Sequence, residues 1–168
     1  MDVRYINAFV KSVGNALGTM CRLPVTFGKP ELKSGDEPSG DVSGIIGFSG
    51  DAAGSVILHF SFDVAAKIAS QFAGVEMTET HPDFADAIGE LANMIAGGAK
   101  SQFEGLRIDI SLPSVVIGPK HNVSRSKDAP RIVVPCRTDA GTFHAEIGML
   151  IGKRSEPANK KVTVGAAT

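Results

Sequence analysis

Glu90 and Asn93 are the two residues of this 168-residue chain whose types and spacing best suit chemistry. They lie three positions apart in a segment with helical periodicity, so their side chains leave the helix side by side. A carboxylate can pair with a lysine, and a carboxamide both donates and accepts hydrogen bonds. Asparagine does not titrate, so its catalytic use is to position a water, as a glutamine does in small GTPases. Such a pair becomes a complete site only if a partner supplies the phosphoryl group, the metal and the lysine.

The helix that carries this pair is predicted to run from Pro82 to about Glu104, with Gly105 ending it. At 100° per residue, its large apolar residues fall within about a 60° sector, which is the predicted buried face. These residues are Phe84, Ile88, Leu91 and Ile95. A second narrow sector lies nearly opposite and contains Asp86, Glu90, Asn93 and Gly97.

Small residues beside this polar sector separate it from an ordinary solvated helix face, which usually carries Lys and Glu pairs. Gly89, Gly97 and Gly98 each cost about 1 kcal/mol relative to alanine within a helix. Three such glycines indicate close approach of something, either the neighbouring sheet or a partner protein docked on the helix. We therefore predict Asp86, Gly89 and Gly97 as partner-binding positions beside Glu90 and Asn93.

The rest of the chain predicts helices and antiparallel hairpins in blocks. Further helices are expected at about 2–20, capped by Asp2, and at 63–73, capped by Asp63 and stopped by Gly74. Extended segments are expected at 25–33, 42–48, 54–61, 107–117 with a break at Pro113, 131–138 and 142–151, and loops at 34–41 and 119–128. This order predicts an α+β fold in which long helices pack on one face of an antiparallel sheet.

A weak internal sequence similarity favours a chain of two duplicated halves. Residues 12–17 (S-V-G-N-A-L) resemble residues 90–95 (E-L-A-N-M-I), and a hairpin follows each segment.

Composition bounds the function classes. With 17 basic and 18 acidic residues, the formal net charge of -1 gives no reason to expect a nucleic-acid partner. No apolar run approaches the roughly 20 residues that span a bilayer, and no signal peptide is visible. We expect a cytoplasmic protein with one domain over residues 1–152 and a disordered tail over 153–168. Cys21 and Cys136 are far apart, and no two of the four histidines share a helical spacing, so no metal site or cofactor of its own is expected.

Other patterns favour ordinary structural interpretations. The glycine-rich segment 44–50 lies between predicted hairpin strands and lacks a following Lys-Ser/Thr, so turn chemistry is the better interpretation than a phosphate loop. His59 and His144 alternate with apolar residues on predicted strands. They are expected to be exposed strand positions or satisfied polar groups.

Residues 86–100 (D-A-I-G-E-L-A-N-M-I-A-G-G-A-K) and 112–118 (L-P-S-V-V-I-G) closely resemble the CheC/CheX/FliY phosphatases of bacterial chemotaxis. The signature of that family is a small or acidic residue, E-x-x-N on a helix, and a proline roughly twenty residues later. The resemblance runs from about Tyr5 to Ile151 and is greatest to the CheX-like members. Two-site members carry E-x-x-N on both related helices, whereas this chain has Ser12 in place of the first glutamate.

The resemblance implies hydrolysis of the aspartyl phosphate on a CheY-type response regulator. Asn93 would orient water in line with the phosphate, Glu90 would pair with the regulator's lysine, and the regulator would hold Mg²⁺. Asp86 is a weaker candidate for contact, and Pro113 would shape the following strand. A homodimer that joins sheets through strand edges is also implied. The alternatives are a non-catalytic adaptor that docks on a regulator or flagellar switch protein, and a structural dimer module with a merely solvated stripe.

Overall fold

The computed structural model describes residues 3–35, 40–124 and 129–152. The helices are α1 (Val3–Met20), α2 (Phe62–Ala73) and α3 (Phe84–Lys100). The strands are β1 (Thr26–Phe27), β2 (Glu31–Leu32), β3 (Gly40–Gly50), β4 (Ala52–Phe60), β5 (Ile108–Ile110), β6 (Ser114–His121), β7 (Arg131–Thr138) and β8 (Gly141–Ile151). The predicted cap Asp2 and the predicted tail 153–168 lie outside the described residues.

One antiparallel sheet contains all of these strands. Its order is β1-β7-β8-β4-β3-β5, with β2 also on β7 and β6 also on β3. The order is symmetric about the contact between β8 and β4, which belong to different hairpins. Short strands of the first half, β1 and β2, extend the second hairpin, and β5 and β6 of the second half extend the first. This interlocked arrangement agrees with the predicted α+β fold of two duplicated halves.

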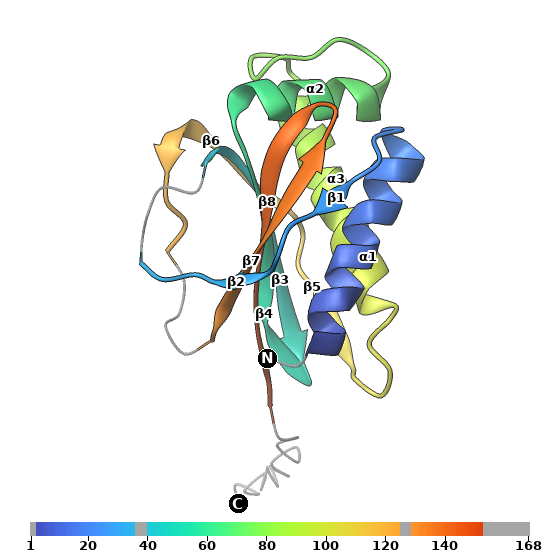
Figure 1. The fold of residues 1–168 in the computed structure, drawn as a ribbon, viewed down its shortest axis with the longest axis vertical. Coiled ribbons are helices and arrows are strands. Elements are labelled where there is room, and N and C mark those ends of the chain that lie inside the picture. Colours follow the sequence, from blue (N-terminus) through green and yellow to red (C-terminus); the bar gives the residue numbers. More distant parts are fainter. Residues whose placement is uncertain (1–2, 36–39, 125–128, 153–168) are drawn as a thin grey trace, which may run out of the picture.

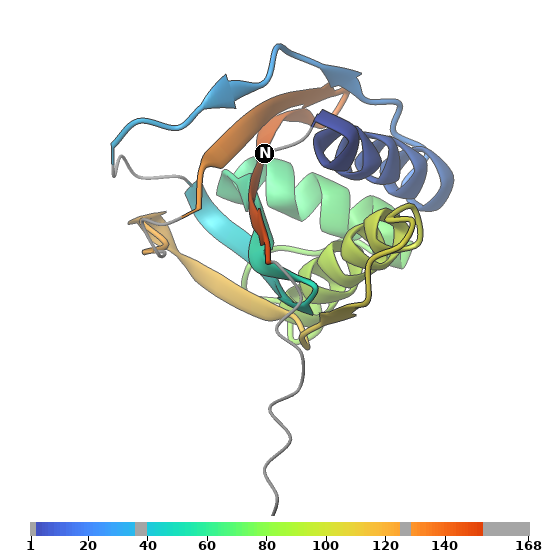
Figure 2. The same cartoon turned by 90° about the horizontal axis from the view of Figure 1, so that it is seen from below.

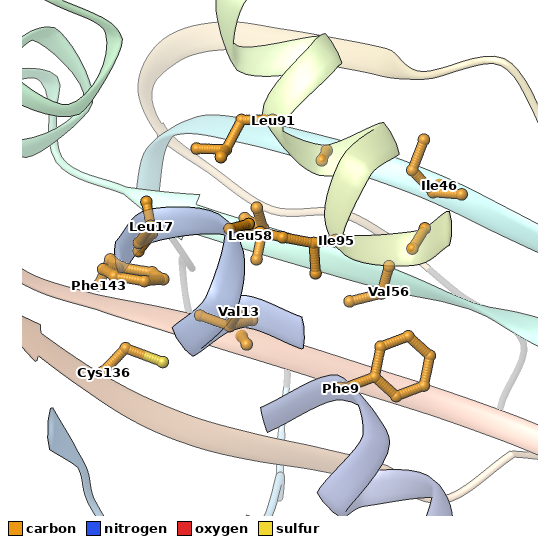
Figure 3. Close-up of a cluster of buried hydrophobic side chains, with 14 of the residues drawn as sticks. Phe9, Val13, Leu17, Ile46, Val56, Leu58, Leu91, Ile95, Cys136 and Phe143 are labelled. Atoms are coloured by element: carbon orange, nitrogen blue, oxygen red, sulfur yellow. The ribbon is translucent and has the colours of Figure 1, made fainter. Parts of the chain in front are cut away.

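Helices α1 and α3 lie side by side on one face of the sheet, and α2 lies across one end (Figures 1 and 2). The core between them and the sheet is apolar and close-packed (Figure 3). Side chains at most 1% exposed come from every layer: Phe9, Val13 and Leu17 of α1, Leu91 and Ile95 of α3, and Val56 and Leu58 of β4. Burial of these side chains is the main stabilisation of the fold, because each fully buried large side chain contributes about 1.5–3 kcal/mol.

The middle of the sheet is buried on its other face as well. Figure 2 shows the sheet curving away from the helices toward its edges at β2 and β6. On β4, Ile57 is 0% and His59 3% exposed, although both alternate with the residues that face the helices.

Three predicted helix boundaries are wrong. Helix α3 begins at Phe84, with Asp83 at its N-cap, rather than at Pro82. Ser61, not Asp63, caps α2, since its side chain accepts a hydrogen bond from the Val64 N–H at 3.3 Å. Helix α3 ends at Lys100 rather than at Glu104. After Lys100 the chain tightens into single turns, and Phe103 turns inward and becomes buried. The predicted stop at Gly74 is confirmed by its left-handed φ of 71°.

The predicted strands are all present, but several bounds differ. The predicted segment 25–33 forms only the short strands β1 and β2, whereas β3 and β6 run further than expected. Strands β3 and β4 leave only Asp51 between them, and β6 extends through His121 into the predicted loop 119–128. That strand continues because it pairs with β3 up to Gly40 across a register shift. The predicted break at Pro113 is confirmed, since it separates β5 from β6.

No helix within the described ranges combines the length and the apolar character that crossing a bilayer requires.

Candidate functional site

Helix α3 presents its polar stripe away from the sheet. This stripe is the polar sector that contains Asp86, Glu90, Asn93 and Gly97. The predicted buried residues Phe84, Ile88, Leu91 and Ile95 are at most 1% exposed, so they set the rotation of the helix. Glu90 is consequently exposed, and Asn93 is half-buried. Asp86 is exposed one turn earlier on the same side of the helix. The structure therefore brings Asp86, Glu90 and Asn93 together on one surface, as the periodicity predicts.

Neither Glu90 nor Asn93 forms a side-chain hydrogen bond or ion pair with any other described residue. A carboxylate and a carboxamide together offer several acceptor sites and two donors. Their hydrogen-bonding capacity is therefore free for water or for another molecule.

The three glycines of α3 have different surroundings. A Cβ at Gly89 would lie 3.4 Å from Pro113 and from Val115, so this glycine allows the β5–β6 connection to pack on the helix. A Cβ at Gly98 would overlap the Ser12 hydroxyl, so this glycine allows α1 and α3 to approach each other. Nothing lies within 4 Å of a Cβ at Gly97. Of the three glycines, Gly97 alone borders open space, and docking of a partner at Gly89 and Gly97 stays a prediction.

Ser12, which stands where a second glutamate would be, is buried between the two helices. It is 4% exposed, and its hydroxyl donates a hydrogen bond of 2.7 Å to the Ile95 carbonyl. This position on α1 therefore serves helix packing and presents nothing to a partner.

A shallow groove of about 430 Å³ runs between α1 and α3 on the exposed side. Lys11 and Asn15 of α1 line it from one side, and Met94 and Gly98 of α3 line it from the other. Met94 directly follows Asn93, so the groove borders the polar stripe on the side toward α1.

A second group of polar residues lies on the opposite face of the sheet, and we call it the far-face cluster: Lys33, Ser43, His59, His121 and Glu146. Lys33 Nζ donates to Glu146 Oε2 at 2.9 Å, and His59 Nε2 lies 3.2 Å from the same oxygen. Ser43 Oγ lies 2.9 Å from His59 Nδ1 and 2.6 Å from His121 Nε2. Ser43, His59 and Glu146 are 0–3% exposed.

Burial lowers the pKa of His59, and the nearby Lys33 and His121 lower it further, whereas the hydrogen bond and the charge of Glu146 oppose the shift. The neutral ring has one N–H, which donates from Nε2 to Glu146. Nδ1 then faces the Ser43 hydroxyl, which also contacts His121 Nε2. A serine, a histidine and a carboxylate thus lie in a row, but Ser43 is 0% exposed and no substrate reaches it.

The alternation on the strands allowed two interpretations of His59 and His144, exposed strand positions or satisfied polar groups. His59 is a satisfied buried group, and His144 is exposed. The role of Glu146 was missed, although a signal exists: it is the one charged residue within β8 (Gly141–Ile151). A lone charge inside an apolar strand indicates a buried partner, because an unpaired charge there is costly. Among the described residues, no group of three or more His, Cys, Asp or Glu side chains is arranged to hold a metal ion.

Comparison with known proteins identifies the family of this fold. The family model described as "Chemotaxis phosphatase CheX" matches residues 42–137, more than half of the chain, including all of α3. The CheY-P phosphatase CheX of Thermotoga maritima is 35% identical over 121 residues, which cover 70% of this chain and 78% of that protein.

Solved structures of CheC-like and CheX proteins share this fold. A CheC-like superfamily protein from Shewanella sp. PV-4 superposes with a TM-score of 0.82 at 34% identity, covering 89% of this chain and 99% of that one. CheX from Borrelia burgdorferi, solved in a CheX–CheY–BeF₃–Mg²⁺ complex, superposes with a TM-score of 0.73 at 25% identity, covering 86% and 97%. The chain therefore belongs to the family of CheX chemotaxis phosphatases, which makes it an enzyme of the hydrolase class.

Proposed function

We propose that this enzyme hydrolyses the aspartyl phosphate of a CheY-type response regulator, with Asn93 and Glu90 as its catalytic residues. The observation that carries the proposal is the pair itself: two adjacent polar side chains on α3 without partners among the described residues. The complex of CheX with CheY, BeF₃ and Mg²⁺ from Borrelia burgdorferi supports the same type of partner.

In the proposed reaction, Asn93 enters the regulator's phosphorylation pocket. Its carboxamide orients a water, whose oxygen bonds to phosphorus as the bond from phosphorus to the aspartyl oxygen breaks. The products are the free aspartate and inorganic phosphate, and one water proton is released. Alignment is the main contribution of this chain, since phosphoryl transfer depends chiefly on positioning and charge stabilisation.

Glu90 holds the complex in register by pairing its carboxylate with the regulator's lysine. Both groups become partly desolvated when the two proteins meet, which strengthens their interaction. The Mg²⁺ that neutralises the phosphoryl oxygens is proposed to be held by the regulator. Asp86 and Gly97 extend the docking surface along α3, and the reaction takes place in the cytoplasm.

A homodimer that joins two sheets is also proposed, and β6 is its best edge. The outer side of β7 pairs with β1 and β2, so this hairpin strand is covered. β6 pairs with β3 alone among the described strands and exposes Val116 and Ile117. A long strand with one open side favours pairing with a second copy.

The test is phosphate release from a phosphorylated CheY-type regulator with wild type, Asn93→Ala and Glu90→Ala. Asn93→Ala is expected to lower turnover on the order of 100-fold or more while binding is largely kept, because positioning terms of this kind are worth several kcal/mol. Glu90→Ala is expected to weaken both turnover and binding. Gln71→Ala, which removes an exposed carboxamide from α2, is the matched control and is expected to behave as wild type.

The alternative function, a non-catalytic adaptor, makes the opposite prediction. An adaptor would bind the activated regulator without accelerating phosphate loss, and Asn93→Ala would then change binding alone. If wild type fails to accelerate release from every CheY-type regulator of its cell, the phosphatase proposal for this substrate is wrong.

A further inference from the structure

The connection between β5 and β6 carries Leu112, which is 87% exposed and is the most exposed large hydrophobic residue in the described part of the chain. Single exposed apolar side chains are common and need no explanation by themselves. Leu112 differs in two respects, which are the stiffness of its loop and its position beside α3.

Hydrogen bonds hold the loop at Ser111, the residue before Leu112. The Ser111 N–H donates to the Gly47 carbonyl at 2.9 Å, and the Gly47 N–H donates to Ser111 Oγ at 2.9 Å. The Ser111 hydroxyl in turn donates to the Leu112 carbonyl at 2.8 Å. Pro113 follows and fixes its own φ. Leu112 is therefore held away from the core by a loop that has little freedom to fold back.

The position of the loop follows from Gly89, which packs against Pro113. Gly89 and Asn93 are related by i,i+4, so they lie one above the other on the same side of α3. Leu112 therefore stands beside the polar stripe, on the flank away from α1. The groove lined by Lys11 and Asn15 borders the other flank.

We infer that Leu112 is an apolar docking residue for the response regulator and contacts an apolar patch beside the regulator's phosphorylation pocket. This inference rests on the proposed function. A partner whose pocket receives Asn93 must also cover the adjoining loop, and a rigid apolar side chain there loses little entropy on binding. Protein interfaces concentrate their affinity in a few such anchors surrounded by weaker contacts.

The experiment compares Leu112→Ala and Leu112→Asp with Leu32→Ala, a control that truncates a 66% exposed leucine on β2. Binding is measured with a CheY-type regulator activated by beryllofluoride and Mg²⁺, and turnover with the same regulator phosphorylated. Leu112→Ala is expected to raise Kd and KM about tenfold at nearly unchanged kcat, a change of ~1.4 kcal/mol. Leu112→Asp is expected to exceed it, and Leu32→Ala to stay within about twofold of wild type.

The outcomes separate this inference from the proposed function. If Asn93→Ala abolishes turnover but both Leu112 variants bind like Leu32→Ala, the docking role is wrong and the phosphatase proposal stands. If wild type binds the activated regulator without hydrolysis and Leu112→Asp weakens that binding, the docking role stands and the phosphatase proposal fails. If wild type does not bind the activated regulator, the docking role is wrong.

Discussion

Two sets of polar side chains lie on opposite sides of the sheet and differ in how completely they are paired. In the far-face cluster, Ser43, His59 and Glu146 are 0–3% exposed, and each has a hydrogen-bond partner within the chain. On α3, Glu90 is exposed, Asn93 is half-buried, and neither has a partner among the described residues. Burial explains the first set, because a polar group removed from water must be paired to avoid a large desolvation cost.

The difference separates polar groups that satisfy one another from polar groups that are free to bind another molecule. The far-face cluster resembles a catalytic row of residues in composition, but its groups satisfy one another and are closed to substrate. The α3 pair satisfies nothing within the described chain and faces outward from a rigid helix. Incomplete pairing at an accessible position is therefore the reason to choose α3, rather than the far-face cluster, as the candidate site.

Glu146→Ala, compared with Glu90→Ala, tests this difference most strongly. Removing Glu146 leaves Lys33 and His59 without their shared carboxylate, so the free energy of unfolding is expected to fall by about 3–5 kcal/mol. Glu90→Ala is expected to change it by at most about 0.5 kcal/mol, since that side chain is exposed. Urea unfolding measures both. Equal losses in the two variants would contradict the assignment.

Gly98→Ala and Gly97→Ala compare neighbouring positions of α3 that face different surroundings. A methyl group at 98 overlaps the Ser12 hydroxyl, which must rotate away and lose its hydrogen bond to the Ile95 carbonyl, so a loss of about 1–3 kcal/mol is expected. A methyl group at 97 meets nothing, and the higher helix propensity of alanine is expected to stabilise the protein by up to about 1 kcal/mol. Thermal unfolding gives the sign of each change. Stabilisation by both substitutions would show that the hydrogen bond of Ser12 contributes little to stability.

Acidification is expected to destabilise the protein. Burial lowers the pKa of His59, so this residue binds a proton more weakly in the native state than in the unfolded chain. The free energy of unfolding is therefore expected to have its full value above about pH 6.5 and to decrease as the pH drops through that value. His59→Gln is expected to reduce the slope, and Asn93→Ala, which removes no titrating group, to keep it. Urea titrations between about pH 7.5 and about pH 5.5 measure the slope.

Lys67→Ala removes an ion pair that is formed within the chain but lies exposed to solvent. Lys67 Nζ lies 2.8 Å from Asp63 Oδ2 on α2, with side chains 55% and 75% exposed. An exposed i,i+4 ion pair contributes only about 0.3–0.5 kcal/mol, so the change in unfolding free energy is expected to be that small and to shrink at high salt. A loss comparable to that of Glu146→Ala would mean that pairing alone, without burial, determines the stability of such groups.

Local sequence patterns predicted much of the fold. The apolar period of α3 predicted four residues that are all at most 1% exposed, and the hairpin and turn signals predicted every main strand. These predictions hold because side-chain periodicity reflects which face of a helix or strand is buried. Helix ends were predicted less well. Helix α3 stops early because Phe103 packs against Tyr5 and Phe9, with ring centroids 5.2 and 5.6 Å away, and no local signal encodes that contact.

For the candidate site, too, the sequence predicted the local features, and the tertiary structure was needed for the long-range contacts. Sequence alone predicted which residues share the outer face of α3, and the structure places Glu90 and Asn93 there. It also predicted close approach at the glycines of α3 without identifying what approaches. Only the tertiary structure shows Pro113 against Gly89 and Ser12 against Gly98, because both contacts join segments distant in the chain.

By itself, the sequence determined the helix, its buried face and the E-x-x-N pair, since each depends on residues within a few turns of one another. The tertiary structure decided which polar groups remain free. Pairing between Ser43 and His121 or between Lys33 and Glu146 spans 78 and 113 positions, and it depends on strand register and sheet curvature. Those long-range contacts close the far-face cluster, whereas the helix rotation leaves Asn93 open to another protein.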